Sequence, residues 1–203
     1  MKTLRLPHFL GGVCLSAAIM LPLSSPANAA DHSYDFIELS PKHIVIDLPD
    51  ELGKKYDTVG FGLSGSVEIS NSSYLRFDGE SFHFDDLGST FNYYRGVFGT
   101  HQSITSRVDA FQEIGLEHFS FDASSDSLNT TELAVSLGLK AKPASLIELE
   151  AKVGLVGSDT TYGAGIRFLG QDELEGASLG ISYLTLDKSG DVNLSALDFR
   201  FNF

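Results

Sequence analysis

The feature that most constrains this chain is an alternation of apolar and polar residues with a period of two. Six segments show it clearly, with apolar side chains at every second position and small or polar side chains between them. They span 58–69, 131–141, 147–155, 162–168, 177–183 and 197–203. Because successive side chains of a β-strand point to opposite faces, this pattern predicts strands that each have one apolar and one polar face.

Four further strands are expected in the first half of the chain, near 33–40, 73–83, 91–100 and 107–121. Their alternation is interrupted at Tyr93-Tyr94 and at Gln112, which we interpret as β-bulges. With these four the sequence predicts ten strands, and an even number brings both ends of a bacterial barrel to the same side. The predicted fold is all-β, a single antiparallel transmembrane β-barrel of ten strands, with eight as the alternative.

The composition of the two faces separates a membrane barrel from a soluble one. A soluble barrel would carry Lys, Glu and Thr on a water-exposed face, whereas the polar face here consists mainly of Gly and Ser with scattered charges of both signs. Small residues and paired charges suit the crowded interior of a narrow barrel, and the aliphatic face suits lipid. The sequence has no Trp, so an interfacial girdle must consist of Tyr and Phe.

The N-terminus predicts export. Lys2 and Arg5 precede an apolar run from Phe9 to Leu23, and Ala27-Asn28-Ala29 forms a small-x-small cleavage site. We therefore expect a signal peptide over 1–29 and a barrel over 30–203 in the bacterial outer membrane. Cleavage would remove the only cysteine, and the mature chain would hold 12 basic against 27 acidic residues. Such a chain has no thiol for a disulfide or metal site and is not expected to bind nucleic acid.

The C-terminal segment resembles a known assembly signal. Leu197, Phe199, Phe201 and Phe203 alternate up to the terminal residue, as in the strand that the barrel-assembly machinery recognises in outer-membrane proteins. Segments 33–38 and 60–66 are similar to small porin-like outer-membrane barrels of proteobacteria in the OmpA/OmpX-like superfamily. This resemblance implies a fold, a location, and outer-membrane lipid and the assembly machinery as partners, rather than a defined activity.

Charged residues on the polar faces are the candidates for a functional role. They are Glu68, Glu132, Lys140, Glu148, Glu150, Lys152, Arg167, Asp198 and Arg200. One interpretation is a ladder of ion pairs that fills a narrow interior, because unpaired buried charges are costly. The other is a polar pore whose charges select small solutes or ions. We favour the filled interior, since barrels of about eight strands leave little space beyond their side chains.

Three other motifs predict no chemistry. Gly60 to Gly65 match G-x-G-x-x-G, but a strand continues through them where a dinucleotide site needs a helix, so no cofactor is expected. His83 lies near Asp85 and Asp86, yet no nucleophile can be matched to it. The acidic segments 122–126 and 187–191 lack a full Ca²⁺ ligand series. The sequence thus favours a structural or surface-interaction protein without catalysis or metal, then a narrow channel, then a barrel hydrolase.

Overall fold

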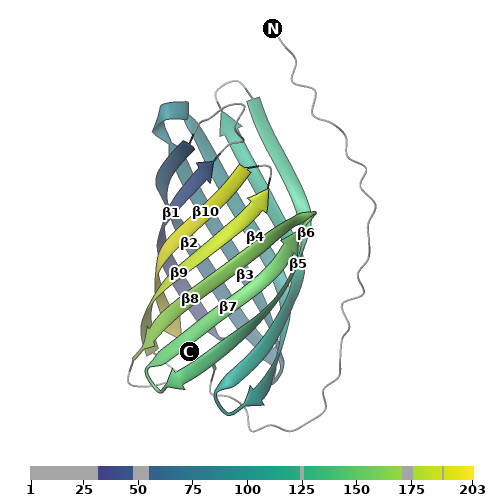
Figure 1. The fold of residues 1–203 in the computed structure, drawn as a ribbon, viewed down its shortest axis with the longest axis vertical. Helices are drawn as coiled ribbons and strands as arrows, with labels where there is room; N and C mark the ends of the chain where they lie inside the picture. Colours follow the sequence, from purple (N-terminus) through teal and green to yellow (C-terminus); the bar gives the residue numbers. More distant parts are fainter. Residues whose placement is uncertain (1–31, 48–54, 124–125, 171–175, 189) are drawn as a thin grey trace.

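The computed structural model describes residues 32–47, 55–123, 126–170, 176–188 and 190–203 (Figure 1). The predicted signal peptide over 1–29 lies outside these ranges, as do central residues of the two acidic segments. The strands are β1 (Phe36–Asp47), β2 (Lys55–Ser70), β3 (Ser73–Phe84), β4 (Ser89–Thr105), β5 (Val108–Ala123), β6 (Asp126–Ala144), β7 (Ile147–Val156), β8 (Asp159–Leu169), β9 (Gly176–Lys188) and β10 (Gly190–Asn202).

The ten strands form one closed antiparallel barrel. Each strand pairs with the next along the chain, and β1 closes the sheet by pairing with β10, with Phe36 opposite Asn202. The prediction of ten strands is therefore confirmed over the eight-stranded alternative. We call the end that carries Phe203 the lower end and the opposite one the upper end (Figure 1). No helix in the described ranges is long and apolar enough to cross a membrane.

Strand pairing extends beyond the strand ranges predicted from sequence. Most of 101–106 and of 142–144 belongs to strands, and the lower turns lie at 106–107 and 145–146. Strand pairing also extends into the acidic segments 122–126 and 187–191. Hydrogen-bonded pairing simply continues past the last clearly alternating residue.

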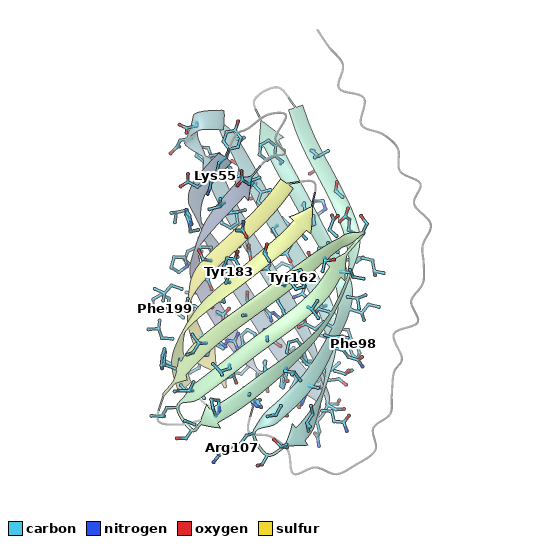
Figure 2. The ribbon with its side chains drawn as sticks, viewed as in Figure 1. Lys55, Phe98, Arg107, Tyr162, Tyr183 and Phe199 are labelled. Carbon is cyan, nitrogen blue, oxygen red and sulfur yellow. The ribbon has the colours of Figure 1, made fainter. Side chains whose placement is uncertain are left out.

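The outer wall carries a continuous apolar band. Its side chains are about half exposed, for example Leu63 at 49%, Leu137 at 57% and Phe199 at 51%. Near its upper boundary lie the exposed rings of Tyr162 and Tyr183 (Figure 2). Together with the exposed ring of Tyr94 on β4 they form what we call the tyrosine girdle. An apolar belt bounded by aromatic rings around a closed sheet is the surface that a bilayer requires of a transmembrane barrel.

The two faces of the wall exchange character near the girdle. Below it, apolar side chains point outward and charges point inward. Above it the interior is apolar, with a buried cluster of Ile44, Phe82, Phe84 and Leu194. The outer wall there is polar, as the exposed hydrogen bond of 2.8 Å from Ser81 Oγ to Asn92 Oδ1 illustrates. The upper part is therefore built like a barrel that stands in water.

The predicted β-bulges at Tyr93-Tyr94 and Gln112 do not occur. The β3–β4 and β4–β5 registers run without a shift through Tyr93, Tyr94 and Gln112. The alternation is blurred at Tyr93-Tyr94 because the apolar face changes sides there, so an inward ring and an outward ring are adjacent. Gln112 faces outward near the lower end and donates a hydrogen bond of 2.9 Å to Thr100 Oγ1. The observed register shifts lie at 68/70, 103/105 and 141/144, each beside a lower turn.

Candidate functional site

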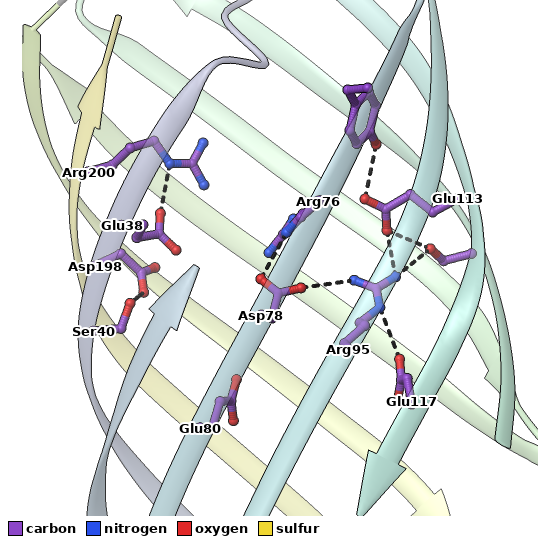
Figure 3. Close-up of polar contacts among 12 residues, drawn as sticks. Glu38, Ser40, Arg76, Asp78, Glu80, Arg95, Glu113, Glu117, Asp198 and Arg200 are labelled. Atoms are coloured by element: carbon purple, nitrogen blue, oxygen red, sulfur yellow. Dashed lines mark hydrogen bonds and ion pairs between the residues drawn. The ribbon is translucent and has the colours of Figure 1, made fainter. Parts of the chain in front are cut away.

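The lumen is the candidate site, and Arg95 is its main cation. Its Nη2 lies 2.6 Å from Glu113 Oε2, its Nε lies 3.0 Å from Glu117 Oε1 and its Nη1 lies 3.6 Å from Asp78 Oδ2 (Figure 3). Asp78 Oδ1 also accepts a hydrogen bond of 2.9 Å from Arg76 Nε. A planar guanidinium suits this role because it presents several donors in fixed directions and keeps its charge when buried.

Hydroxyl groups complete the environment of Glu113. Its Oε1 accepts a hydrogen bond of 3.0 Å from Tyr74, and its Oε2 accepts one of 3.0 Å from Ser136. The side chain of Glu113 is only 1% exposed. A buried carboxylate needs this number of donors, because the lost hydration must be replaced by hydrogen bonds and an opposite charge.

A second group of ion pairs joins strands that are far apart in the sequence. Glu38 Oε2 lies 2.6 Å from Arg167 Nη2 and 2.7 Å from Arg200 Nε. Arg167 Nη1 also lies 3.3 Å from Glu148 Oε1. The two groups meet at the Phe36 ring, which has Arg200 Cζ 3.7 Å and Arg76 Cζ 5.8 Å from its centroid. We call both groups together the central network. Its members are Glu38, Arg76, Asp78, Arg95, Glu113, Glu117, Glu148, Arg167 and Arg200.

The segment before β1 closes the lower end from inside. Tyr34 is 1% exposed and stacks on the rings of His101 and Tyr74, with centroids 4.0 and 4.7 Å away. Lys140 Nζ lies 4.0 Å from the centre of the Tyr34 ring, a cation–π contact. His32 Nδ1 lies 2.9 Å from Glu148 Oε2. These five side chains, His32, Tyr34, Tyr74, His101 and Lys140, form what we call the lower cap.

Glycines make room for the cap. A Cβ atom on Gly99 would lie 2.2 Å from the Tyr74 ring, and one on Gly138 would lie 2.2 Å from the ring of Phe111. Both contacts are closer than any side chain permits. Small residues on the inner face are therefore required wherever a large ring crosses the lumen.

The structure places the nine charges singled out from the sequence in different surroundings. Glu148, Arg167 and Arg200 belong to the central network, and Lys140 belongs to the lower cap. Asp198 accepts a hydrogen bond of 2.7 Å from Ser40, and Glu68 lies 3.5 Å from His101. Glu150 and Lys152 line a cavity in the lumen. Glu132 lies beside Gly157 in the β7–β8 turn and opposite Glu117 in the β5–β6 register.

Sequence reasoning missed six of the nine residues of the network. Glu38, Arg76, Asp78, Arg95, Glu113 and Glu117 all come from β1 and β3–β5, where the alternation changes faces. The signal was present, since Arg76, Asp78 and Glu80 are spaced by two residues on one face of β3. Another pair missed from sequence is Lys42 with Glu80, whose side chains form an ion pair.

Two small cavities lie in the described part of the lumen. A polar cavity of about 100 Å³ is lined by charged residues of the network together with Glu150 and Lys152. An apolar cavity of about 70 Å³ lies among Ile44, Phe91, Phe119, Ala134, Val156 and Leu194. Both cavities have Glu80, Tyr93, Arg95 and Lys152 in their walls.

The remaining motifs lie away from this interior chemistry. His83 is exposed on the upper outer wall, with Nε2 3.4 Å from Asp85 and Nδ1 3.2 Å from the Thr90 hydroxyl. Gly60 to Gly65 lie within β2, and no helix follows them before β3. Across the ranges that the structure describes, no group of three or more His, Cys, Asp or Glu could hold a metal ion.

No protein-family model matches the sequence, and no curated protein matches it. Among solved structures, the chain is similar to Neisserial surface protein A, with 12% identity, a TM-score of 0.44, and coverage of 84% of this chain and 98% of that one. It is also similar to the outer membrane protein OprG from Pseudomonas aeruginosa, with 13% identity, a TM-score of 0.45, and coverage of 86% of this chain and 99% of that one. A third similar structure is the translocator domain of the autotransporter NalP from Neisseria meningitidis, with 12% identity, a TM-score of 0.49, and coverage of 86% of this chain and 90% of that one. The assignment of the fold rests on this chain's own closed sheet and apolar band.

Proposed function

We propose that this protein is a closed barrel of the bacterial outer membrane with a structural or surface-interaction role and no open channel. The observation that carries the proposal is the filled lumen. The lower cap closes one end, the central network crosses the interior from β1 to β8, and the two cavities described above measure about 100 and 70 Å³. A polar solute would have to break several buried ion pairs to pass.

The upper part of the barrel supports the surface role. At the tyrosine girdle and above it, the outer wall carries polar side chains that bond to one another, including His118 Nδ1 with Thr131 Oγ1 at 2.8 Å and His43 Nε2 with Asp57 Oδ2 at 3.5 Å. A wall of this composition belongs in water rather than lipid. It would present a rigid polar surface on the outside of the cell, where neighbouring molecules could contact it.

A narrow channel for small solutes or ions is the second candidate. It is favoured by the shared wall of the two cavities, since Glu80, Tyr93, Arg95 and Lys152 line both. A small movement of these side chains would join the two cavities. The lower cap would still have to move before a solute could cross.

Conductance across a planar bilayer separates the two candidates. We expect no steady open level from the purified barrel, with insertion verified in the same preparation by the heat-dependent gel shift of a folded barrel. A reproducible open level would refute the closed-barrel proposal. In that case Glu148→Gln and Arg167→Gln should alter ion selectivity, because both side chains would face the conducting path.

A further inference from the structure

The upper rim of the barrel is stepped, because neighbouring strands differ in length. β6 has 19 residues, whereas β7 beside it has ten. The register between these two strands begins where Ala134 lies opposite Val156, and β6 continues above that point over 126–133. Among the described residues, this part of β6 pairs with β5 alone. Figure 1 shows it rising above the upper ends of β7 and β8, so one side of β6 is an open sheet edge there.

The last backbone hydrogen bond on that side fixes which groups the edge presents. The N–H of Gly157 donates a hydrogen bond of 2.9 Å to the carbonyl oxygen of Leu133. Because the direction of backbone hydrogen bonding alternates along an antiparallel strand, Asn129 and Thr131 point their N–H and C=O groups to the same side as Leu133. Both residues are exposed, and no described strand or turn supplies them with a backbone partner there. Two donors and two acceptors therefore line the open edge.

The sequence of this edge does not block the pairing of another strand. Proteins usually blunt an exposed edge with lysine, proline or a β-bulge. The segment 128–132 reads Leu-Asn-Thr-Thr-Glu, without lysine or proline, and its register with β5 runs without a shift. Figure 2 shows that this part of the wall stands above the level of Tyr162 and Tyr183, where the barrel leaves the lipid. A soluble chain can therefore reach the edge.

The charges around the edge indicate the chemistry of a partner. Glu132 lies on β6 itself, and the exposed Asp122 on β5 lies opposite Ser127 of β6. Asp159 begins β8 at the turn beside the edge. Three carboxylates next to one edge favour a basic strand. They disfavour a second copy of this chain, which would bring the same three carboxylates to the contact.

We propose that the upper edge of β6 binds an extended basic segment of a partner protein, which extends the barrel wall as an added strand above the β7–β8 turn. Main-chain hydrogen bonds to Asn129 and Thr131 hold the segment, and its basic side chains face the carboxylates around Glu132. In this mode of recognition the backbone supplies affinity and the side chains supply specificity. The inference rests on the proposed surface role and names the kind of partner that the surface takes.

Hydrogen exchange of single amides, followed by NMR on the full barrel in zwitterionic nanodiscs, tests the edge directly. Without a ligand, the amides of Asn129 and Thr131 should exchange faster than those of Leu128 and Thr130, which point to β5. The probe is a synthetic heptapeptide that alternates valine and lysine. At about ten times its Kd it should slow exchange at Asn129 and Thr131 about tenfold. A peptide that alternates valine and glutamate is the control and should give no protection.

Variants of one edge residue separate backbone pairing from side-chain contact. Asn129→Pro removes an edge N–H at a position where proline is tolerated, and should weaken binding of the lysine peptide about tenfold or more. Asn129→Ala keeps the N–H and is the matched control, which should bind as the wild type does. Glu132→Gln should weaken binding about two- to fivefold, as expected for a solvated ion pair. Isothermal titration against empty nanodiscs gives these affinities.

Three results would overturn the proposal: no protection of the edge amides in folded wild type, equal binding by the two Asn129 variants, or equal binding of the lysine and glutamate peptides. If Asn129→Pro does not fold, the exchange pattern and the comparison of the two peptides decide. Both faces of a nanodisc are open to solvent, so these measurements judge the edge whichever way the barrel is oriented in the cell. A conducting wild type would refute the closed lumen and leave the peptide affinities as they are.

Discussion

Replacing Arg95 by methionine removes the cation that three carboxylates share, and the structure allows the cost to be estimated. Asp78 keeps Arg76 at 2.9 Å, and Glu113 keeps its hydrogen bonds to Tyr74 and Ser136. Glu117, whose side chain is 9% exposed, loses the one ion pair that the described residues provide. Removing one partner of a buried ion pair costs about 3–5 kcal/mol. Because two of the three carboxylates retain other partners, we expect the free energy of unfolding to fall by about 3 kcal/mol.

The measurement is reversible urea unfolding of the barrel in lipid vesicles, followed by far-ultraviolet circular dichroism because the chain has no Trp. Arg107→Met is the matched control, since Arg107 is exposed at a lower turn (Figure 2) and should change stability by less than about 0.5 kcal/mol. Adding Glu113→Gln and Glu117→Gln to Arg95→Met should restore at least about half of the loss, because the unpaired charges disappear. Equal stability of the two arginine variants, or no recovery in the triple variant, would refute the reasoning.

Two other predictions concern the inner wall and assembly. Gly99→Ala should lower the free energy of unfolding by about 1–3 kcal/mol, because its Cβ would meet the Tyr74 ring, whereas the control Gly96→Ala faces open space on the same strand and should change it by less than about 0.5 kcal/mol. The same urea assay checks this pair, and equal effects would contradict the prediction. Deleting Phe203 should leave export intact but reduce the urea-resistant fraction in the outer membrane, because the exposed terminal ring that directly follows β10 is lost. Phe168→Ala, which removes an equally exposed ring elsewhere, should assemble normally, and a comparable defect there would count against a specific terminal signal.

Local alternation was enough to find the strands, because the side-chain period of a strand is a property of the backbone itself. It placed Glu148, Arg167 and Arg200 on the polar faces of β7, β8 and β10. It also distinguished the lipid-facing residues Leu197, Phe199, Phe201 and Phe203 from Asp198 and Arg200 between them. The same rule did less well in β3 and β4, since it assumes that one face stays apolar along the whole strand.

Only the closed barrel decided which charges meet and where the interior changes character. Glu38 forms ion pairs with Arg167 and Arg200, which lie 129 and 162 residues away in the sequence. These pairs are set by the closure of β1 on β10 and by the register of every strand between them. No local pattern contains that information, because register in a closed sheet depends on all the strands together. The stacking of Tyr34 inside the lower end, and the apolar cavity beside Lys152, likewise depend on side chains that converge across the lumen from opposite walls.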